Sequence, residues 1–504
     1  MKVLLINSNT FKQPWPVIPF GLCCVAAAVE QAGHDVTVLD LCFASNPAEA
    51  IRKAVAQHRP DVVGISVRNI DNSVGFQTQF LLESTKTNVI EPCKQSFSGP
   101  IVLGGPALGI NGREMLEFFG VPFAIAGDGE EAMVSFLGRI RDGAPLEDVP
   151  GLIYRSSNGT VVEHAPSRVR DLNSLPVVDP SRYLDLKPYL QYNSPLQVQT
   201  KRGCPLACVY CTYNRIEGRT YRLKKPERVV DEIALLVEKT GIRCVEFTDS
   251  TFNIPLPHAK NVLKLLIARQ LHLQVRTMGL NPGAVDEELV ELMKKAGFTE
   301  VDVGAESGSD RMLESLGKNF RKKDILRTGE LLQKAGIPVT WYLLLGAPGE
   351  TTQTLQETFE TMEKAAASWD LINVAVGIRL YNGAPITERV RKDFPSLAVE
   401  KRNFLFPAHL PDSYGLDVHT IKDLTKRQAM RKSNYYMYDE DEKTPPALLR
   451  CIATLYRLGR IQQPLWRSFI LLRRLQKITG YTTLRRFLYE SRMGSKRQPA
   501  KLSG

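Results

Sequence analysis

The sequence KRGCPLACVYC at residues 201–211 decides the fold, because it places three thiols, Cys204, Cys208 and Cys211, within eight residues. Thiolates are the soft ligands that iron-sulfur clusters require. Three of them would leave one iron of a four-iron cluster without a protein ligand, and that open iron can bind a substrate. We therefore predict that these cysteines hold a 4Fe-4S cluster.

The alternatives are a structural zinc site and three packed core cysteines. Structural zinc needs a fourth ligand and usually paired C-x₂-C knuckles. The loop contains no His, and the chain has no second C-x₂-C. The other cysteines sit singly or in apolar runs, so we expect them in the core: Cys23, Cys24, Cys42, Cys93, Cys244 and Cys451.

The cysteine loop follows the first of six predicted strands. These strands are expected at residues 196–200, 244–248, 273–277, 300–303, 338–345 and 371–376, with helical runs between them. Six β/α units predict a partial barrel over residues 196–400, with fewer units than the eight of a closed barrel. Such a fold exposes its chemistry at the carboxyl ends of its strands, where this loop lies.

The first 140 residues also alternate strands with helices. Strands are expected at 2–7, 35–41, 61–67, 101–104 and 124–127, and helices at 20–31 and 47–58. This spacing predicts an α/β domain with a doubly wound, Rossmann-like parallel sheet, which binds ligands beyond the carboxyl ends of its strands. Turn residues in 141–195 predict a linker with one hairpin near 152–162.

Residues 401–504 are predicted to form a basic, mostly helical C-terminal region. Of the net charge of +11, residues 443–504 carry +13, from fourteen Lys and Arg against one Glu, so residues 1–442 carry −2. Hydrophobic content of 43% and charged content of 24% exclude wholesale disorder. The sequence has no apolar run of about eighteen residues that could span a membrane, and its N-terminus turns polar too soon for a signal peptide. We therefore expect the chain in the cytoplasm.

Residues 196–380 resemble the radical SAM superfamily, in which a C-x₃-C-x₂-C loop follows the first strand of a partial (β/α)₆ barrel. The resemblance implies that the open iron chelates the amino and carboxylate groups of S-adenosylmethionine. It also implies S-adenosylmethionine contacts from Tyr210 at the adenine, Asp249 at the ammonium, Arg276 and Ser307 at the carboxylate, Glu306 at the ribose and Gly346 at the adenosine. Structural roles are the alternative for Asp249 and Arg276, and Glu350 and Thr351 are expected to start a helix.

Residues 1–140 resemble the cobalamin-binding domain that precedes many radical SAM enzymes, on the stretches 63–67, 103–106 and 127–131. The resemblance implies cobalamin contacts from Ser66, Val67, Gly104, Gly105, Gly129 and Glu130. The first strand does not end in G-x-G-x-x-G, which argues against nicotinamide or flavin. The Asp-x-His-x-x-Gly motif is absent, so we expect cobalamin without a His ligand. Retention of the domain without its cofactor is the alternative.

Residues 447–493 interleave Arg with Leu, Trp and Phe. This basic amphipathic composition predicts peripheral contact with the inner face of a membrane and an apolar substrate such as a lipid or a tetrapyrrole. Nucleic-acid binding and a basic helical cap over the barrel mouth are the alternatives.

These features together predict a cobalamin-dependent radical SAM methyltransferase that acts on an unactivated carbon of an apolar or natural-product-like small molecule. A reductant protein such as flavodoxin or ferredoxin is the expected partner. One alternative is a radical SAM cyclase or carbon-skeleton enzyme without methyl transfer, as in tetrapyrrole synthesis. A further alternative is a cofactor-dependent sensor that binds nucleic acid through its tail. The sequence nominates no substrate-facing catalytic residue.

Overall fold

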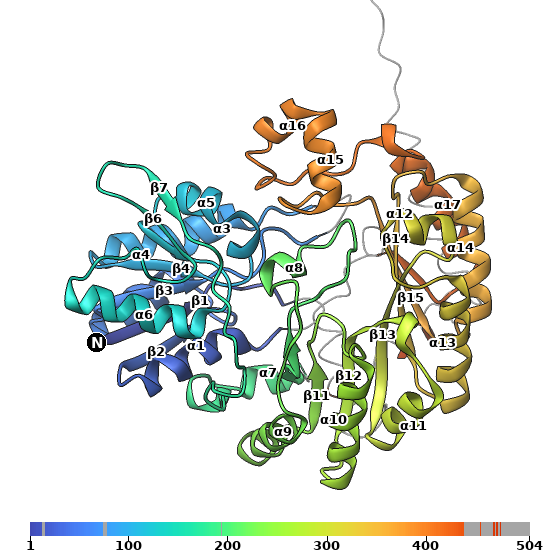
Figure 1. Cartoon of the computed structure of the whole chain (residues 1–504), viewed down its shortest axis with the longest axis horizontal. Helices are drawn as coiled ribbons and strands as arrows, with labels where there is room; N and C mark the ends of the chain where they lie inside the picture. Colours follow the sequence, from blue (N-terminus) through green and yellow to red (C-terminus); the bar gives the residue numbers. More distant parts are fainter. Residues whose placement is uncertain are drawn as a thin grey trace, which may run out of the picture.

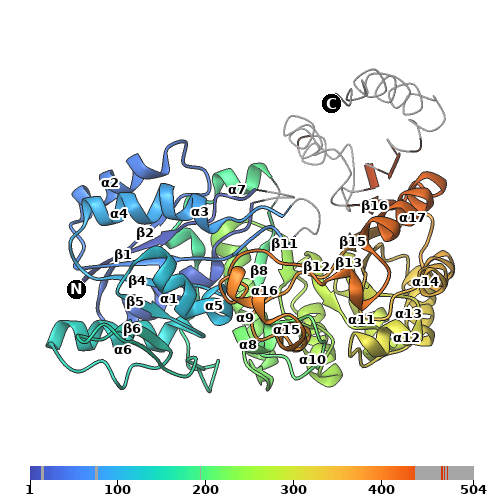
Figure 2. The ribbon, with the colours of Figure 1, turned by 90° about the horizontal axis from the view of Figure 1, so that it is seen from above.

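Two domains lie side by side in the computed structural model (Figure 1). The structure describes residues 1–12, 16–73, 78–192 and 194–437, together with Thr454, Arg467, Ser468, Ile470, Leu471 and Arg474. Seen from above, the N-terminal domain and the second domain remain adjacent (Figure 2).

The N-terminal domain is built on a seven-stranded sheet with the order β2-β1-β3-β4-β5-β6-β7. The first five strands pair in parallel, and a hairpin adds the last two in antiparallel fashion. The strands are β1 (Lys2–Asn7), β2 (Asp35–Asp40), β3 (Val62–Ser66), β4 (Ile101–Gly104), β5 (Phe123–Ile125), β6 (Leu152–Arg155) and β7 (Val161–Glu163). The predicted hairpin is confirmed, and it extends this sheet.

Helices cover both faces of the N-terminal sheet. They are α1 (Phe20–Gln31), α2 (Pro47–His58), α3 (Leu82–Thr85), the π-helix Lys86–Ile90, α4 (Glu91–Ser96), α5 (Leu108–Phe119) and α6 (Gly129–Asp142). Successive residues of a strand point to opposite faces. In β1, Val3 and Leu5 therefore pack with α1 and α6, whereas Leu4 and Ile6 pack with α2 and α5. The sheet is doubly wound, as predicted.

Local capping explains where α2 begins. The Asn46 side chain accepts a 3.1 Å hydrogen bond from the Glu49 backbone N–H, which satisfies one of the free donors of the first turn. Pro47 follows at the first helical position, where its missing N–H costs nothing.

The second domain is built on a seven-stranded parallel sheet with the order β16-β15-β14-β13-β12-β11-β8. The strands are β8 (Leu196–Val198), β11 (Cys244–Phe247), β12 (Gln274–Leu280), β13 (Phe298–Glu306), β14 (Val339–Leu345), β15 (Leu371–Val376) and β16 (Tyr435–Met437). Six of these are the strands predicted for the partial barrel. β16 was not predicted, because three residues are too few to show a pattern.

Helices cover the outer face of the barrel sheet (Figure 1). They are α9 (Pro226–Thr240), α10 (Leu256–Ala268), α11 (Glu287–Lys295), α13 (Lys322–Ala335), α14 (Thr352–Ala365) and α17 (Val418–Arg431). The α/β fold class and the partial barrel are thus confirmed over the described residues. α14 begins where the sequence predicted a helix start, because the Thr351 side chain accepts a hydrogen bond from the Thr354 N–H.

Short segments complete the described chain. α7 (Lys187–Gln191) precedes the barrel, and α15 (Pro385–Asp393) and α16 (Pro395–Glu400) follow β15 at the top of Figure 1. Within the part of the chain that the structure describes, no helix is long and apolar enough to cross a membrane. Most of the predicted amphipathic segment 447–493 lies outside the described residues.

Candidate active site

The cysteine loop lies between β9 (Lys201–Arg202) and the short helix α8 (Tyr213–Ile216), directly after the first barrel strand. Gly203 enters it with φ +93°, and a Cβ at this position would lie 2.0 Å from the Thr220 carbonyl oxygen. Only glycine fits this turn. The Cys204 N–H then donates to the Gly218 carbonyl at 2.9 Å. The backbone therefore fixes where the first thiol stands.

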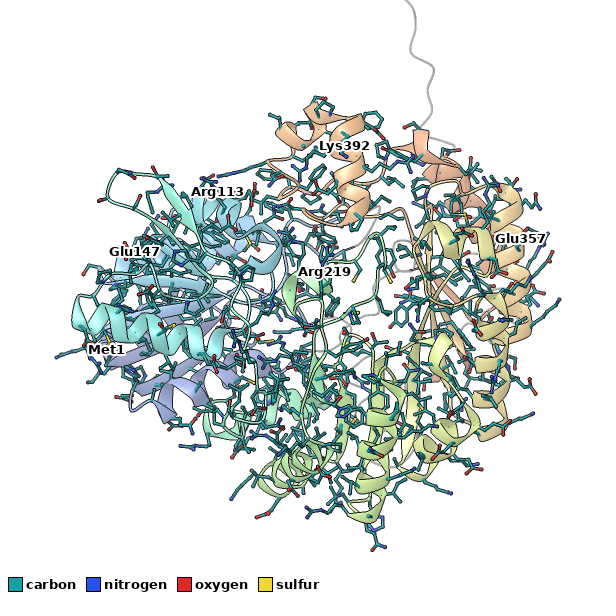
Figure 3. All side chains as sticks on the ribbon, in the orientation of Figure 1. Met1, Arg113, Glu147, Arg219, Glu357 and Lys392 are labelled. Atoms are coloured by element: carbon teal, nitrogen blue, oxygen red, sulfur yellow. The ribbon has the colours of Figure 1, made fainter. Side chains whose placement is uncertain are left out.

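The cysteine loop leads into α8, which lies in the middle of the molecule (Figure 1). Arg219, labelled in Figure 3, extends from the segment between α8 and β10 (Arg222–Leu223), close to the boundary of the two domains. Cys204 is buried, and Cys208 and Cys211 are half-buried. A cluster bound here would be shielded from most solvent while keeping one side accessible.

The surroundings of Cys208 and Cys211 disfavour their thiolate forms. Burial raises the pKa of Cys208 and raises that of Cys211 to about 11, and in each case the neighbouring thiols add to the rise. These groups are therefore protonated without a metal, and binding of iron must displace their protons. Among the described residues, no group of three or more His, Cys, Asp or Glu side chains is close enough to hold a single metal ion. In a four-iron cluster each thiolate would bind a different iron, so the three thiols need not converge on one point.

A buried polar network lies beside the cysteine loop. The Tyr210 hydroxyl donates a 2.7 Å hydrogen bond to Glu306 Oε1 at the end of β13. The Lys318 ammonium lies 3.3 Å from both this carboxylate oxygen and the Tyr210 hydroxyl. Burial disfavours the Lys318 charge, but the carboxylate of Glu306 and the Cys208 thiol raise its pKa above the ordinary value. The structure thus brings two expected contact residues together and adds a cation to them.

The backbone at Glu306 is unusual. Its φ of +58° lies in the left-handed region that non-glycine residues rarely adopt. Strain of this kind persists where the surroundings impose it, and it concentrates at functional sites. The position and conformation of Glu306 therefore favour a ligand-binding role.

Lys318 was missed by the sequence analysis, because an isolated lysine after a glycine carries no signal. It follows the short helix α12 (Asp310–Ser315). Gly317 has φ +67°, and a Cβ there would lie 2.6 Å from the Ala207 carbonyl oxygen inside the cysteine loop. This close approach, available only to glycine, places Lys318 beside the thiols.

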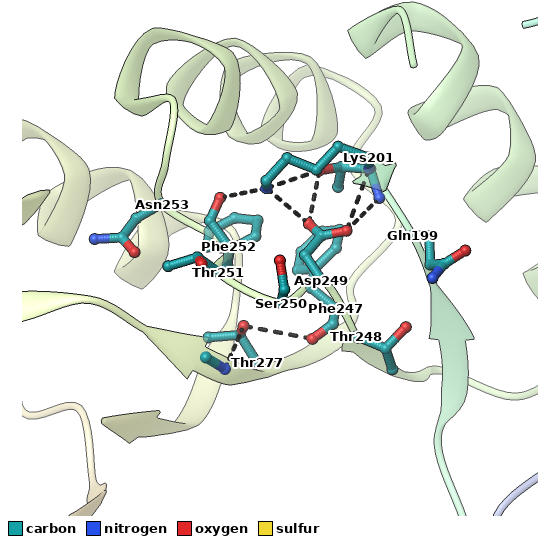
Figure 4. Close-up of polar contacts among 12 residues, drawn as sticks. Gln199, Lys201, Phe247, Thr248, Asp249, Ser250, Thr251, Phe252, Asn253 and Thr277 are labelled. Carbon is teal, nitrogen blue, oxygen red and sulfur yellow. Dashed lines mark hydrogen bonds and ion pairs between the residues drawn. The ribbon is translucent and has the colours of Figure 1, made fainter. Parts of the chain in front are cut away.

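The Asp249 carboxylate has several protein partners at the end of the first barrel strand. Its carboxylate accepts hydrogen bonds from the Thr200 N–H (2.8 Å), the Thr200 hydroxyl (2.7 Å) and the Lys201 ammonium (3.1 Å) (Figure 4). The side chains of Asp249 and Lys201 are both fully buried. Asp249 thus holds the end of β8 at the entrance to the cysteine loop. Its expected contact with the methionine ammonium stays a prediction.

Arg276 lies between two carboxylates of the neighbouring strands. Its guanidinium pairs with Glu246 of β11 at 2.8 Å and with Glu300 of β13 at 3.1 Å. These residues occupy paired positions on adjacent strands. Two buried carboxylates thus pair with Arg276, as the structural alternative expects. Its contact with the S-adenosylmethionine carboxylate stays a prediction.

Ser307 and Gly346 both lie at the carboxyl ends of barrel strands. The Ser307 side chain is buried against α14, where its hydroxyl lies 2.8 Å from that of Thr358. Its expected contact with the S-adenosylmethionine carboxylate stays a prediction. Gly346 has φ +94°, and its N–H donates to Glu350 at 3.2 Å, so the expected tight turn is present.

The cobalamin candidates divide into two groups. Ser66, Val67, Gly104 and Gly105 lie together at the carboxyl ends of β3 and β4, where the Val67 N–H donates to the Gly104 carbonyl at 2.8 Å. A Cβ on Gly104 would meet no atom within 4 Å, whereas one on Gly105 would lie 2.5 Å from the Val67 oxygen. This edge offers open space above a tightly packed backbone, which suits a large ligand.

Gly129 and Glu130 form the other group, and both face protein. A Cβ on Gly129 would lie 2.9 Å from a methyl group of Val25, so this glycine allows close packing of α6 on α1. The Glu130 carboxylate receives two hydrogen bonds from Arg202, at 2.6 and 3.2 Å. Gly129 thus takes part in helix packing and Glu130 in an ion pair between the domains. Their expected cobalamin contacts stay predictions.

The three histidines that precede the barrel all lie near other protein groups. His34 directly precedes β2, and His58 ends α2 four residues before β3, so both lie near the amino ends of these strands, where they contact Met1 and Thr37. His164 lies 2.9 Å from the Val149 carbonyl oxygen. That cobalamin lacks an imidazole ligand from this domain stays a prediction, which the missing Asp-x-His-x-x-Gly motif motivates.

Comparison with protein families identifies both domains. Residues 198–362 match the family model of the radical SAM superfamily. Residues 10–137 match the B12 binding domain.

Individual relatives combine the same parts. The chain is 26% identical to tryptophan 2-C-methyltransferase of Streptomyces laurentii over 75% of this chain and 72% of that protein. It is 24% identical to the anaerobic magnesium-protoporphyrin IX monomethyl ester cyclase of Rubrivivax gelatinosus, over 91% and 83% of the two chains. The radical S-adenosylmethionine methyltransferase TsrM from Kitasatospora setae, solved with cobalamin and a [4Fe-4S] cluster, superposes with a TM-score of 0.71 at 26% identity and covers 78% of each chain.

The fold and the site therefore define an iron-sulfur enzyme with a second, Rossmann-like cofactor domain. The chain carries a radical SAM domain preceded by a B12 binding domain. Its cofactors are a 4Fe-4S cluster, S-adenosylmethionine and cobalamin. The sensor alternative is set aside, because the chain is a radical SAM enzyme.

Proposed function

We propose that this chain is a cobalamin-dependent methyltransferase that transfers a methyl group to an unactivated carbon of a small molecule. The observation that carries the proposal is the junction at Arg202. This residue stands two positions before Cys204 and ion-pairs with Glu130 at the start of α6. The cysteine loop is thus tied directly to the domain that binds cobalamin, as a reaction using both cofactors requires.

A second ion pair strengthens this junction. Asp128, just before α6, pairs with Arg222 of β10 and lies 3.4 Å from Arg202. It also accepts a 2.8 Å hydrogen bond from the Val169 N–H. β9 and β10, which flank the cysteine loop, are therefore both anchored to the N-terminal domain.

The residues around the loop have separate tasks in this proposal. When bound, the cluster supplies the electron that cleaves S-adenosylmethionine, and cobalamin supplies a cobalt that can carry a methyl group. Tyr210, Glu306 and Lys318 would orient S-adenosylmethionine through hydrogen bonds and charge. Their burial excludes water, which would otherwise quench reactive species.

The relatives support methyl transfer to carbon. A relative named for methylation of tryptophan carbon and a solved methyltransferase each cover about three quarters of this chain. The cyclase relative covers 91% of the chain, so a cyclase without methyl transfer is the second candidate.

Product mass separates the two candidates. The full chain, reconstituted anaerobically with cluster and cobalamin, would be given a reductant, S-adenosylmethionine with a deuterated methyl group, and panels of indoles, tetrapyrroles and lipids. The proposal expects a product that carries the labelled methyl group, and none with Cys208→Ala. A cyclised product without label would favour the second candidate.

The substrate proposal also includes an apolar, membrane-associated molecule, a lipid or a tetrapyrrole, delivered by residues 447–493. Its basis is the charge of +13 in residues 443–504 combined with apolar residues. Co-sedimentation with anionic and neutral vesicles would compare the full chain with a version ending at Thr444. Attachment that weakens with salt and needs the tail supports the proposal. If RNA binds and vesicles do not, the substrate class moves to nucleic acid.

A further inference from the structure

A second contact between the two domains lies away from the cysteine loop. It joins residues 67–73, which follow β3, to residues 378–410, which follow β15. The isolated bridge between Arg379 and His409 holds the second segment together. Each segment leaves the carboxyl end of its sheet, so the contact links the two edges at which the cofactors bind.

Asp71 is the centre of this contact. Its carboxylate accepts a 2.7 Å hydrogen bond from Arg379 Nε and a 3.0 Å bond from the Tyr381 hydroxyl, across 308 and 310 positions of sequence. It also accepts the Ser73 N–H at 2.8 Å. The side chains of Asp71 and Arg379 are 0% and 4% exposed, so this is a fully desolvated ion pair.

Arg379 is in turn fixed from its own side. Its guanidinium donates to the Phe404 carbonyl at 3.2 Å and lies over the Tyr381 ring, 4.5 Å from the centroid. A guanidinium held at several points has little freedom to find another partner. The ion pair of Asp71 therefore depends on Arg379 being held in this position.

Further hydrogen bonds join the same segments of the two domains around this ion pair. The Thr78 hydroxyl lies 3.2 Å from His409 Nε2. The Asn382 amide donates to the Ile110 carbonyl at 3.2 Å, and the Asn111 amide donates to the Asn403 carbonyl at 3.0 Å. α5, which contains Ile110 and Asn111, follows the β4 edge with Gly104. The segment after β15 thus docks beside both strands that form the open edge.

We propose that Asp71 and Arg379 are positioning residues for cobalamin, because they hold the chain after β3 in the conformation that leaves the β3–β4 edge open to the corrin. Asp71 stands only five positions after Ser66, the last residue of β3. If the carboxylate loses its partner, the buried negative charge drives this segment toward solvent. The inference rests on the cobalamin dependence of the function proposed above.

A purely structural ion pair would lower the free energy of unfolding without a selective effect on cobalamin. The test therefore measures the affinity for hydroxocobalamin by equilibrium dialysis, with iron content and unfolding measured in parallel. The variants are Asp71→Asn, Arg379→Gln, Arg379→Lys and the double variant Asp71→Asn/Arg379→Gln in the full chain. The control is Glu232→Gln, which breaks a similarly buried pair with Lys224 inside the barrel domain.

We expect the affinity of both neutralised variants to fall about tenfold or more, with iron content unchanged. The double variant should bind no more weakly than either single one, and Arg379→Lys should retain part of the affinity. Glu232→Gln should bind like the original chain. Affinities of all variants within twofold of the original would overturn the inference. Failure of the original chain to bind the corrinoid would instead refute the proposed function.

Discussion

Tyr210 and Glu306 are separated by 96 positions, yet the tyrosine hydroxyl donates a 2.7 Å hydrogen bond to the carboxylate. This bond connects the cysteine loop, on the first barrel strand, to the end of the fourth, β13. Because Lys318 contacts both groups, a change at one residue alters the hydrogen bonding of the other two. The three side chains therefore act as a unit.

We expect Glu306→Gln and Tyr210→Phe each to weaken binding of S-adenosylmethionine to the cluster-loaded chain. A hydrogen bond to a charged group contributes about 1.5–3 kcal/mol, so Glu306→Gln should lower the affinity about tenfold or more and Tyr210→Phe somewhat less. Equilibrium dialysis under anaerobic conditions measures this. Unchanged affinity in both variants, with full iron content, would show that the network has no part in binding.

The cluster prediction concerns Cys204, Cys208 and Cys211. The chain purified without oxygen should be brown and hold about four iron atoms, and changing any one of these residues to Ala should abolish formation of 5′-deoxyadenosine. Cys93→Ala is the matched control, because Cys93 is a buried thiol in the N-terminal core. Normal turnover by Cys208→Ala would contradict the assignment.

The junction between the domains should contribute strongly to stability. The side chains of Arg202 and Glu130 are 11% and 4% exposed, and removing Glu130 leaves the buried Arg202 only its longer, 3.4 Å contact with Asp128. We expect Glu130→Gln to lower the free energy of unfolding by about 3–5 kcal/mol, measured by urea denaturation. The exposed pair of Glu49 with Arg52 supplies the control, and Glu49→Gln should unfold like the original chain. Equal effects of both changes would argue against a special role for the junction.

Much of the fold could be predicted from the sequence because strand and helix periods are local properties. All six barrel strands and the five parallel strands of the N-terminal sheet were predicted. The presence of Cys204, Cys208 and Cys211 in one loop after the first barrel strand was predicted as well. The core location of Cys23, Cys24, Cys42, Cys93 and Cys244 is confirmed, and Cys451 lies outside the described residues.

The partners of charged residues could not be predicted. The structure pairs Asp249 with the fully buried Lys201, and Arg276 with the cross-strand glutamates Glu246 and Glu300. These pairs depend on strand register, which no local pattern encodes. Glu130 depends on how two domains dock, and Lys318 on the close approach that Gly317 allows.

The position of the histidines leads to a prediction about cobalt. Because His34 and His58 lie at the amino ends of the strands, the reduced corrinoid should lack an imidazole nitrogen signal in electron paramagnetic resonance. His409 of the barrel domain contacts Thr78, so it is the histidine to test as an alternative cobalt ligand. A nitrogen signal that disappears in His409→Gln would contradict the prediction and identify the ligand.

The central claim is that one chain uses S-adenosylmethionine with both a cluster and cobalamin. The most direct measurement is the yield of S-adenosylhomocysteine and 5′-deoxyadenosine from the reconstituted chain, with and without cobalamin, under a strong reductant. We predict that both products form, that S-adenosylhomocysteine requires cobalamin, and that 5′-deoxyadenosine requires Cys204, Cys208 and Cys211. If neither product forms with both cofactors bound, or if S-adenosylhomocysteine forms equally without cobalamin, the account is contradicted.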